Sequence, residues 1–392
     1  MTAPLAWGIF GVNLNVWADA FLRLQLVVLV MTVTVMGLIY LERKFVGRIQ
    51  MRLGPMRTGP YGTLQSIADA IKLLTKEDLR PATADFWLFE LAAYVTFVPV
   101  FMTLLALPFM DDWGVRDLQL GLFYIVSVSG ITVIGYIMAG WASDNKYALL
   151  GAVRSAAQLI SYEIPLILAV LATAMVAGTL NLTEITKQQD TIPNIVMQPL
   201  PFLVILTATL AELSRRPFDI PIGESELVGG PWVEYSGIRW SIIFALTEYA
   251  GMWGMSIVVS LVFLGGWEWP FGTKDWWGDF AWLYQLVLTF VKSFLLILTF
   301  MWISATFPRL RIDQLMALCW KILLPFGFLQ IVINGIVLTY ITSEYPRDIV
   351  LLITSGGLMA AMSYTIYMAT RQPPREERVR GILPAAAARS TP

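Results

Sequence analysis

The sequence predicts an all-α polytopic membrane protein, because the chain is strongly apolar and its apolar residues form long continuous runs. Of its 392 residues, 57% are hydrophobic and only 14% are charged, and the mean hydropathy is +0.66. A soluble domain has about 25% charged residues and does not leave so much apolar surface in water. The runs reach the roughly 20 residues that a transmembrane helix needs, and they lack the alternation of a lipid-spanning barrel.

Nine segments have the length and composition of transmembrane helices. They lie at 22–41, 86–110, 119–140, 159–180, 195–213, 240–265, 281–304, 319–341 and 348–370. We therefore expect residues 1–370 to form a single integral membrane domain of about nine transmembrane helices. The tail at 371–392 is basic and rich in Pro and Ala, which is typical of a flexible segment. No positively charged leader precedes the first span, so no cleaved signal peptide is expected.

The distribution of Lys and Arg predicts the orientation of these spans, since basic residues accumulate in cytoplasmic loops. Most of them fall in the loops and tail on one side, at 42–85, 141–158, 214–239, 305–321 and beyond 370. The loops on the other side hold only Arg116, Lys187, Lys274 and Arg347. We therefore expect the N-terminus outside and the C-terminus in the cytoplasm.

The first cytoplasmic loop, 42–85, is longer than a helix connection requires. Four of its apolar residues share one helical face: Leu64, Ile67, Ile71 and Leu74. They predict an amphipathic helix that lies along the membrane surface or packs under a partner. Upstream, Lys44, Arg48 and Arg52 recur every four residues and would share a face of a helix; a basic collar that contacts anionic lipid is the simpler interpretation.

The composition excludes several kinds of site. The chain has no His and a single Cys, Cys319, so histidine relays, histidine-bound haem or zinc, disulfides and cysteine-ligated iron–sulfur clusters are excluded within this chain. It also lacks the glycine-rich motifs that cradle nucleotides. Any side-chain proton relay is therefore expected to use carboxylates.

Ionisable residues inside the predicted spans are the main candidates for function, since each costs about 2.5–3.5 kcal/mol at the centre of a helix on insertion scales. The candidates among them are Glu163, Glu212, Glu248 and Lys292. One interpretation is a proton path through carboxylates whose environment perturbs their titration. The other is structural, in which these groups cap helix ends or pair with one another.

The second long cytoplasmic loop, 212–239, is acidic and stiffened by Pro217 and Pro221. A charge run of this kind is usually a solvated loop. Because this one leads back to intramembrane carboxylates, a coupling element is the alternative interpretation.

Four stretches of the chain resemble one known family. They are Glu42-Arg43-Lys44 through Gly54-Pro55 and Gly59-Pro60 to Asp78; Gly140-Trp141 through Gly151 with Ser161-Tyr162-Glu163; Pro217-Phe218-Asp219 with Glu234-Tyr235-Ser236-Gly237 and Glu248-Tyr249; and Pro308-Arg309 through Trp320-Lys321. Spread over residues 20–340, they resemble the quinone-site membrane subunits of respiratory complex I, the proton-translocating NADH–quinone oxidoreductase.

This resemblance implies a core subunit that couples quinone reduction to proton translocation. By position, the residues at the quinone cavity would be Arg43, Arg52, Asp69, Phe218 and Asp219. The residues of the acidic path would be Glu163, Glu212, Glu224, Glu226 and Glu248. Ubiquinone or menaquinone would be the substrate, with no covalently bound cofactor and no metal in this chain.

The same resemblance implies partners and a location. Flavin and iron–sulfur clusters would lie in other subunits, and the partners would be the hydrophilic-arm quinone-site and iron–sulfur subunits, the small and antiporter-like membrane subunits, and membrane lipid, with no nucleic acid. The location would be the plasma (inner) membrane of a bacterium.

The chain departs from the family pattern at several positions. Ile222 stands where the family has a Glu, Ser304 where it has an Arg, Met56 where it has an Asn, and Pro231-Trp232 where it has Tyr-His. These departures leave open a homologous subunit of a membrane-bound hydrogenase, or of a dehydrogenase fed by coenzyme F420 or ferredoxin. A stand-alone ion transporter would also use intramembrane acids, but the two long loops favour large docking partners.

Overall fold

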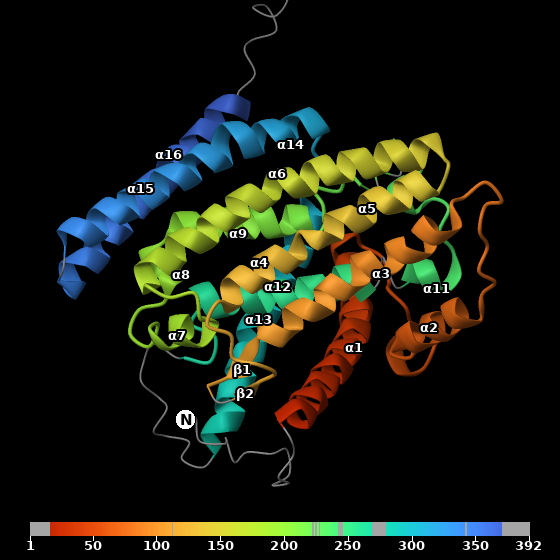
Figure 1. The fold of residues 1–392 in the computed structure, drawn as a ribbon, viewed down its shortest axis with the longest axis horizontal. Helices are drawn as coiled ribbons and strands as arrows, with labels where there is room; N and C mark the ends of the chain where they lie inside the picture. Colours follow the sequence, from red (N-terminus) through yellow and green to blue (C-terminus); the bar gives the residue numbers. More distant parts are fainter. Residues whose placement is uncertain are drawn as a thin grey trace, which may run out of the picture.

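The computed structural model describes residues 16–111, 113–221, 223, 226, 228–241, 246–268, 280–341 and 343–370. Helices dominate this part of the chain (Figure 1). Seven helical segments in it are long and apolar enough to cross a membrane: Ala18–Ile49, Phe86–Ala106, Gly121–Ala142, Lys146–Ala177, Ala281–Thr306, Ile312–Tyr340 and Pro346–Met368. The predicted helical membrane fold is therefore confirmed.

The elements follow one another along the chain with few strands. The first half contains α1 (Val16–Ile49), η2 (Pro60–Gly62), α2 (Gln65–Thr75), α3 (Phe86–Thr103), η3 (Leu104–Ala106), β1 (Pro108–Met110), β2 (Trp113–Gly114), α4 (Gly121–Ser129), α5 (Ile131–Ala142) and α6 (Lys146–Ala177). The second half contains α7 (Leu182–Lys187), α8 (Asn194–Met197), α9 (Pro199–Glu212), η4 (Gly230–Trp232), α11 (Gly237–Trp240), α12 (Thr247–Phe263), α13 (Ala281–Thr306), α14 (Ile312–Leu318), the π-helix η8 (Cys319–Leu323), α15 (Leu324–Tyr340) and α16 (Glu344–Thr370).

Two of the nine predicted spans fold as shorter helices. The segments 195–213 and 240–265 contain α9, with 14 residues, and α12, with 17. At 1.5 Å per residue they reach about 21 and 26 Å, less than the roughly 30 Å of the hydrocarbon core. Residues 242–245 and 269–279, which flank α12, lie outside the described residues, as does the tail at 371–392.

Several predicted boundaries were wrong. The span at 86–110 ends early, because α3 stops at Thr103 and residues 108–110 form β1, which pairs antiparallel with β2. The expected loop at 141–158 is largely helical, because the side chain of Asn145 accepts a hydrogen bond from the Tyr147 N–H and caps α6 at Lys146. The span at 159–180 ends at Ala177, where Gly178 adopts a left-handed conformation (φ 69°).

The first loop also begins later than expected. Helix α1 continues to Ile49, so Glu42, Arg43 and Lys44 are helical. Arg52 lies in the turn beyond its end, and the predicted face shared with Lys44 and Arg48 does not extend to it. The amphipathic helix predicted in this loop is present as α2, and its apolar residues Ile67, Ile71 and Leu74 are exposed.

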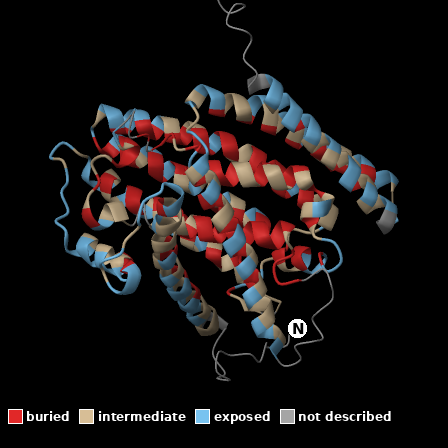
Figure 2. Cartoon of the chain, turned by 180° about the vertical axis from the view of Figure 1, so that it is seen from behind, coloured by how far each residue is buried: buried red, intermediate tan, exposed pale blue. Residues whose placement is uncertain are grey.

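Helices α6, α9 and α12 lie at the centre of the fold. Figure 2 shows buried residues concentrated in these central helices and exposed residues on α1, α2 and α16. Most residues of α12 are buried, among them Trp253 and Phe263. The outer faces of α1, α13 and α16 carry exposed large apolar residues such as Leu29, Phe294 and Ile353, as expected of lipid-facing helices. Figure 1 shows α15 and α16 side by side along α6.

Candidate functional site

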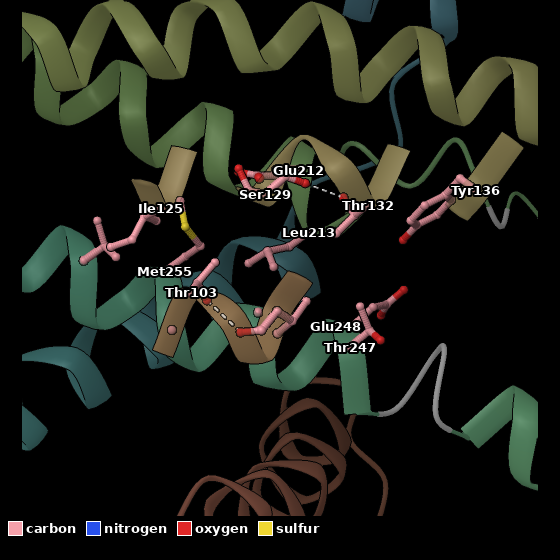
Figure 3. A pocket seen from close by; sticks show the side chains of 14 residues that line it. Thr103, Ile125, Ser129, Thr132, Tyr136, Glu212, Leu213, Thr247, Glu248 and Met255 are labelled. Carbon is pink, nitrogen blue, oxygen red and sulfur yellow. Dashed lines mark hydrogen bonds between the residues drawn. The ribbon is translucent and has the colours of Figure 1, made fainter. Parts of the chain in front are cut away.

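A partly enclosed cavity lies between α3, α4, α5, α9 and α12. Its volume is about 60 Å³, enough for several water molecules. Two carboxylates and five hydroxyls line it together with apolar side chains: Glu212, Glu248, Thr103, Ser129, Thr132, Tyr136 and Thr247 (Figure 3). The sequence placed both glutamates in separate spans, and the structure brings them to one cavity.

The helix ends position the two carboxylates. Glu212 is the last residue of α9, and Glu248 lies in the first turn of α12. Figure 3 shows Glu212 beside Ser129 on one side of the cavity and Glu248 beside Thr247 on the other. Because the cavity separates them, a proton moving between these carboxylates would pass through water or hydroxyl groups.

Glu163 approaches the same region from the middle of α6. Its Oε1 would lie 2.6 Å from a Cβ atom built on Gly130, which occupies the break between α4 and α5. Glu163 is also close enough to Glu212 for their charges to interact. The absence of a side chain at Gly130 therefore makes room for the Glu163 carboxylate next to Glu212.

Arg215 joins this cavity to α1. Its Nη1 lies 2.7 Å from Oε1 of Glu42, its Nη2 lies 3.9 Å from Oε2 of Glu248, and its guanidinium stacks 4.5 Å from the Tyr249 ring centroid. Burial alone would lower the pKa of Arg215, which lies in the turn after α9, but Glu42, Tyr249 and Glu248 raise it above its ordinary value. Arg215 is thus a permanent cation between two carboxylates.

The residues predicted for the quinone cavity fall into separate clusters. Arg43 Nη1 lies 2.6 Å from Asp69 Oδ2, and Gln65 Nε2 donates to Asp69 Oδ1 at 3.0 Å. Burial opposes ionisation of Asp69, but the hydrogen bonds from Arg43 and Gln65 and the nearby positive charges lower its pKa below the ordinary value. The structure therefore brings Arg43 and Asp69 together at the junction of α1 and α2.

Phe218, Asp219 and Arg52 lie elsewhere. Phe218 is buried against Tyr162, with ring centroids 5.4 Å apart, and Asp219 is close enough to Glu248 for their charges to interact. Arg52 is exposed and donates to Gln50 Oε1 at 2.7 Å. Asp219 thus lies within electrostatic range of a cavity residue, Glu248, whereas Arg52 lies on the surface.

Glu226 and Lys292 lie apart from the cavity. Glu226 is half-exposed and pairs with Arg154 Nη1 of α6 at 2.7 Å. Glu224 and Ile222 lie outside the described residues. Lys292 donates to the backbone oxygens of Leu264, at 2.7 Å, and Glu268, at 2.5 Å, and so caps the C-terminal end of α12.

Sequence reasoning did not select Arg215, Tyr136 or Glu42 as site residues. Arg215 was one charge among many in an acidic loop, and its partner Glu42 lies 173 positions away. Residues so far apart in the sequence have no characteristic spacing from which their ion pair could have been predicted. Within the described ranges, no cluster of three or more His, Cys, Asp or Glu side chains is placed to hold a metal ion.

Comparison with known proteins adds the family. Residues 22–335 match the model of the NADH dehydrogenase family. This chain belongs to that family. It is 46% identical over 320 residues to the NADH-quinone oxidoreductase subunit designated H in Dehalococcoides mccartyi strain CBDB1, covering 81% of this chain and 87% of the relative. The proteins of the same name in Brevibacillus brevis (47% over 302 residues; 77% and 88%) and Bacillus mycoides (45% over 326 residues; 82% and 95%) are similarly related.

Family membership confirms the resemblance seen in the motifs. The matched range contains every residue of the cavity, the Arg43–Asp69 pair and the Glu42–Arg215 bridge. Helix α16 lies beyond the matched range.

The Arg43–Asp69 pair leads to a prediction about pH. Because the pKa of Asp69 is lowered, its carboxylate is ionised above the ordinary Asp value, and the pair is lost only as pH falls through the still lower pKa of the folded state. We expect Asp69→Asn to raise the KM for quinone about threefold to tenfold, and by the same factor at every pH between about 5 and 8. Quinone KM measured against pH in both proteins checks this, and a ratio that varies within that range would contradict it.

Proposed function

We propose that this chain is the membrane-arm subunit of a proton-translocating NADH–quinone oxidoreductase that forms part of the quinone chamber and couples quinone reduction to proton movement. The observation that supports this most directly is the cavity on which Glu212 and Glu248 converge, with Arg215 bridging Glu248 to Glu42 of α1. The names of the relatives point to the same complex.

The contacts between Glu42, Arg215 and Glu248 suggest how reduction of a quinone could affect the protonation of Glu248. Reducing a quinone to a quinol adds two electrons and two protons, so negative charge and proton demand arise where the quinone binds. Arg43, Asp69 and Asp219 are the candidate groups on that side. A charge change near Asp219 or Glu42 alters the field at Arg215 and Glu248, and so changes how readily Glu248 holds a proton.

The acidic path then runs from Glu248 through the cavity to Glu212 and Glu163. Several water molecules in the cavity, with the hydroxyls of Ser129, Thr132 and Tyr136, would supply the intervening proton carriers. Glu224 and Glu226 are assigned to the loop that leads into this path. The chain uses no metal and no covalently bound cofactor in this scheme; its substrate is ubiquinone or menaquinone.

The proposal includes the wider setting of the chain. Residues 1–370 form one membrane domain of nine spans, with α9 and α12 as short spans, the N-terminus outside and the C-terminus in the cytoplasm of a bacterium. Flavin and iron–sulfur clusters lie in the hydrophilic-arm partners, and the small and antiporter-like subunits lie beside this chain in the plasma membrane.

The test uses the complete complex, purified through a tag on this chain and reconstituted in liposomes. We expect flavin and iron–sulfur subunits to co-purify and NADH oxidation by quinone to acidify the liposome lumen. We expect Glu212→Gln to lower the number of protons moved per electron about fivefold, since water in the cavity still offers a partial route.

The matched control is Glu184→Gln, because Glu184 is an exposed glutamate on α7 whose carboxylate accepts a hydrogen bond from the nearby Thr179 hydroxyl. It should leave the proton yield unchanged. A hydrogenase or ferredoxin-type module in place of the NADH-oxidising subunits would overturn the assignment to this complex. An unchanged proton yield in Glu212→Gln would overturn the acidic path.

A further inference from the structure

The surface helix α2 is held by its ends rather than by its apolar face. Only Ser66 of α2 is buried, and Ile67, Ile71 and Leu74 are exposed by 44%, 56% and 63%. At its start, Gln65 and Asp69 are bonded to Thr58 and Arg43. Because its apolar face is exposed, the position of α2 depends on these contacts at its start and on the contacts made by residues 76–80, which follow its end.

That segment, residues 76–80, is fastened to the second cytoplasmic loop. The Leu79 N–H donates to Ser236 Oγ at 3.0 Å, and the Ser236 hydroxyl lies 3.3 Å from the Leu79 oxygen. Gly237, with a positive φ of 58°, brings its backbone against the carbonyl oxygens of Lys76 and Glu77, which a Cβ atom there would approach to about 3.4–3.5 Å. These contacts join the two long loops, 157 positions apart in the sequence.

One arginine lies at the centre of this junction. Arg239 Nη2 lies 2.9 Å from Asp78 Oδ2 of the first loop and also contacts Glu90 Oε1 of α3. Its guanidinium lies 5.5 Å from the Phe89 ring centroid, and its side chain is only 18% exposed. The same cation thus contacts both the first loop and a membrane helix.

Neighbouring contacts hold the arginine in place. The ring of Tyr235 stacks on Phe89 with centroids 4.1 Å apart, and its hydroxyl donates to the Phe89 oxygen at 3.1 Å. Arg80 lies over the Phe86 ring and 3.8 Å from Glu90. An arginine held among two carboxylates and an aromatic face uses its planar, multi-donor geometry, which a lysine reproduces only in part.

We propose that Arg239 is a positioning residue that fixes α2, and with it the Arg43–Asp69 pair, relative to α3 and the second loop, and thereby sets quinone binding. The proposal rests on the proposed function. Without the Arg239 cation, Asp78 loses its ion pair with the second loop, and the segment after α2 is left with the longer contacts of Arg80, to Glu90 at 3.8 Å and to the Phe86 ring, as its ties to α3. Since α2 has few other buried contacts, its displacement should weaken quinone binding more than it affects turnover of quinone once bound.

The test measures KM and kcat of the purified, reconstituted complex with a short-chain water-soluble quinone analogue. We expect Arg239→Gln to raise KM about tenfold while kcat stays within about twofold, and Arg239→Lys to recover about half of the lost affinity on a logarithmic scale. Lys187→Gln is the matched control, because it removes a cation from an ion pair with Asp111 (2.5 Å) next to the β1–β2 hairpin; its KM should equal that of the wild type.

If Arg239→Gln prevents assembly, Asp78→Asn is a milder change that weakens the same Arg239–Asp78 ion pair, with an expected rise in the KM for quinone of about threefold. An unchanged KM in Arg239→Gln or, where that variant does not assemble, in Asp78→Asn would overturn the proposal, as would an equal rise in the Lys187→Gln control. These failures differ from failure of the proposed function, in which the wild-type complex itself would not reduce quinone or move protons.

Discussion

Replacing Arg215 by Met should lower proton-coupled quinone reduction by at least 100-fold. Arg215 lies between Glu42 and Glu248, and its side chain is only 12% exposed. Removing one member of a buried ion pair costs about 3–5 kcal/mol, because the remaining charge has no partner. Here two carboxylates would lose their cation at once. If about 3 kcal/mol of this loss is felt in the rate-limiting transition state, the rate falls more than 100-fold.

The measurement is proton uptake and NADH oxidation by the reconstituted complex, with its subunit content checked on a native gel. Arg215→Lys is the informative second variant, since it keeps a charge but can approach the two carboxylates and Tyr249 only as a point donor; it should retain more activity than Arg215→Met. Should Arg215→Met assemble and retain more than half of the wild-type rate, the bridge between α1 and the cavity would carry no function.

The helical architecture was predictable because the length of an apolar run matches the thickness of the membrane. The residues at which the helices begin and end were less predictable, since helix ends depend on individual side chains. The start of α6 at Lys146 had a local signal in Asn145, a favoured N-cap residue. The end of α3 had no sequence signal of comparable strength. The helix ends at Thr103, the turn η3 follows, and the chain then forms a hairpin in which Pro108 pairs with Gly114.

The candidate site was predictable in its acids and not in their partners. Intramembrane carboxylates stand out in a sequence because they are costly in lipid. In the structure Glu163 is near Glu212, and Glu212 and Glu248 line the same cavity from opposite sides. Arg215 and Arg239 were hidden among other loop charges, because the residues they contact come from distant elements. Ion pairs between residues that are distant in the sequence produce no periodic pattern. The contacts of Arg215 and Arg239 with the membrane helices could therefore be identified only from the structure.

Arg215 and Arg239 attach the two ends of the second loop to other parts of the fold. Arg215 ties its beginning to α1 and α12, and Arg239 ties its end to the first loop and α3. Between them lie Phe218, packed on Tyr162, and Asp219, within electrostatic range of Glu248. The described ends of this loop are therefore fixed by ion pairs to helices of the membrane domain.

Replacing Gly130 by Ala should impair proton movement without weakening the fold. Gly130 has helical dihedral angles (φ −60°, ψ −23°) at the junction of α4 and α5, and Ala is favoured over Gly in helices by about 1 kcal/mol. The added Cβ would lie 2.6 Å from Oε1 of Glu163. This oxygen is the end of a flexible side chain, so the carboxylate would turn away and leave the neighbourhood of Glu212 instead of disrupting the backbone.

We expect about a tenfold lower proton yield per electron in Gly130→Ala, with thermal stability of the complex equal to or above that of the wild type. Gly37→Ala is the matched control, because Gly37 lies inside α1 and a Cβ there meets no atom within 4 Å. Gly130→Ala should also add little to Glu163→Gln, because both changes remove the same carboxylate from the path. Full additivity of the two would show that Gly130 acts on something other than Glu163, and a wild-type proton yield in Gly130→Ala would show that the position of Glu163 beside Glu212 is not required.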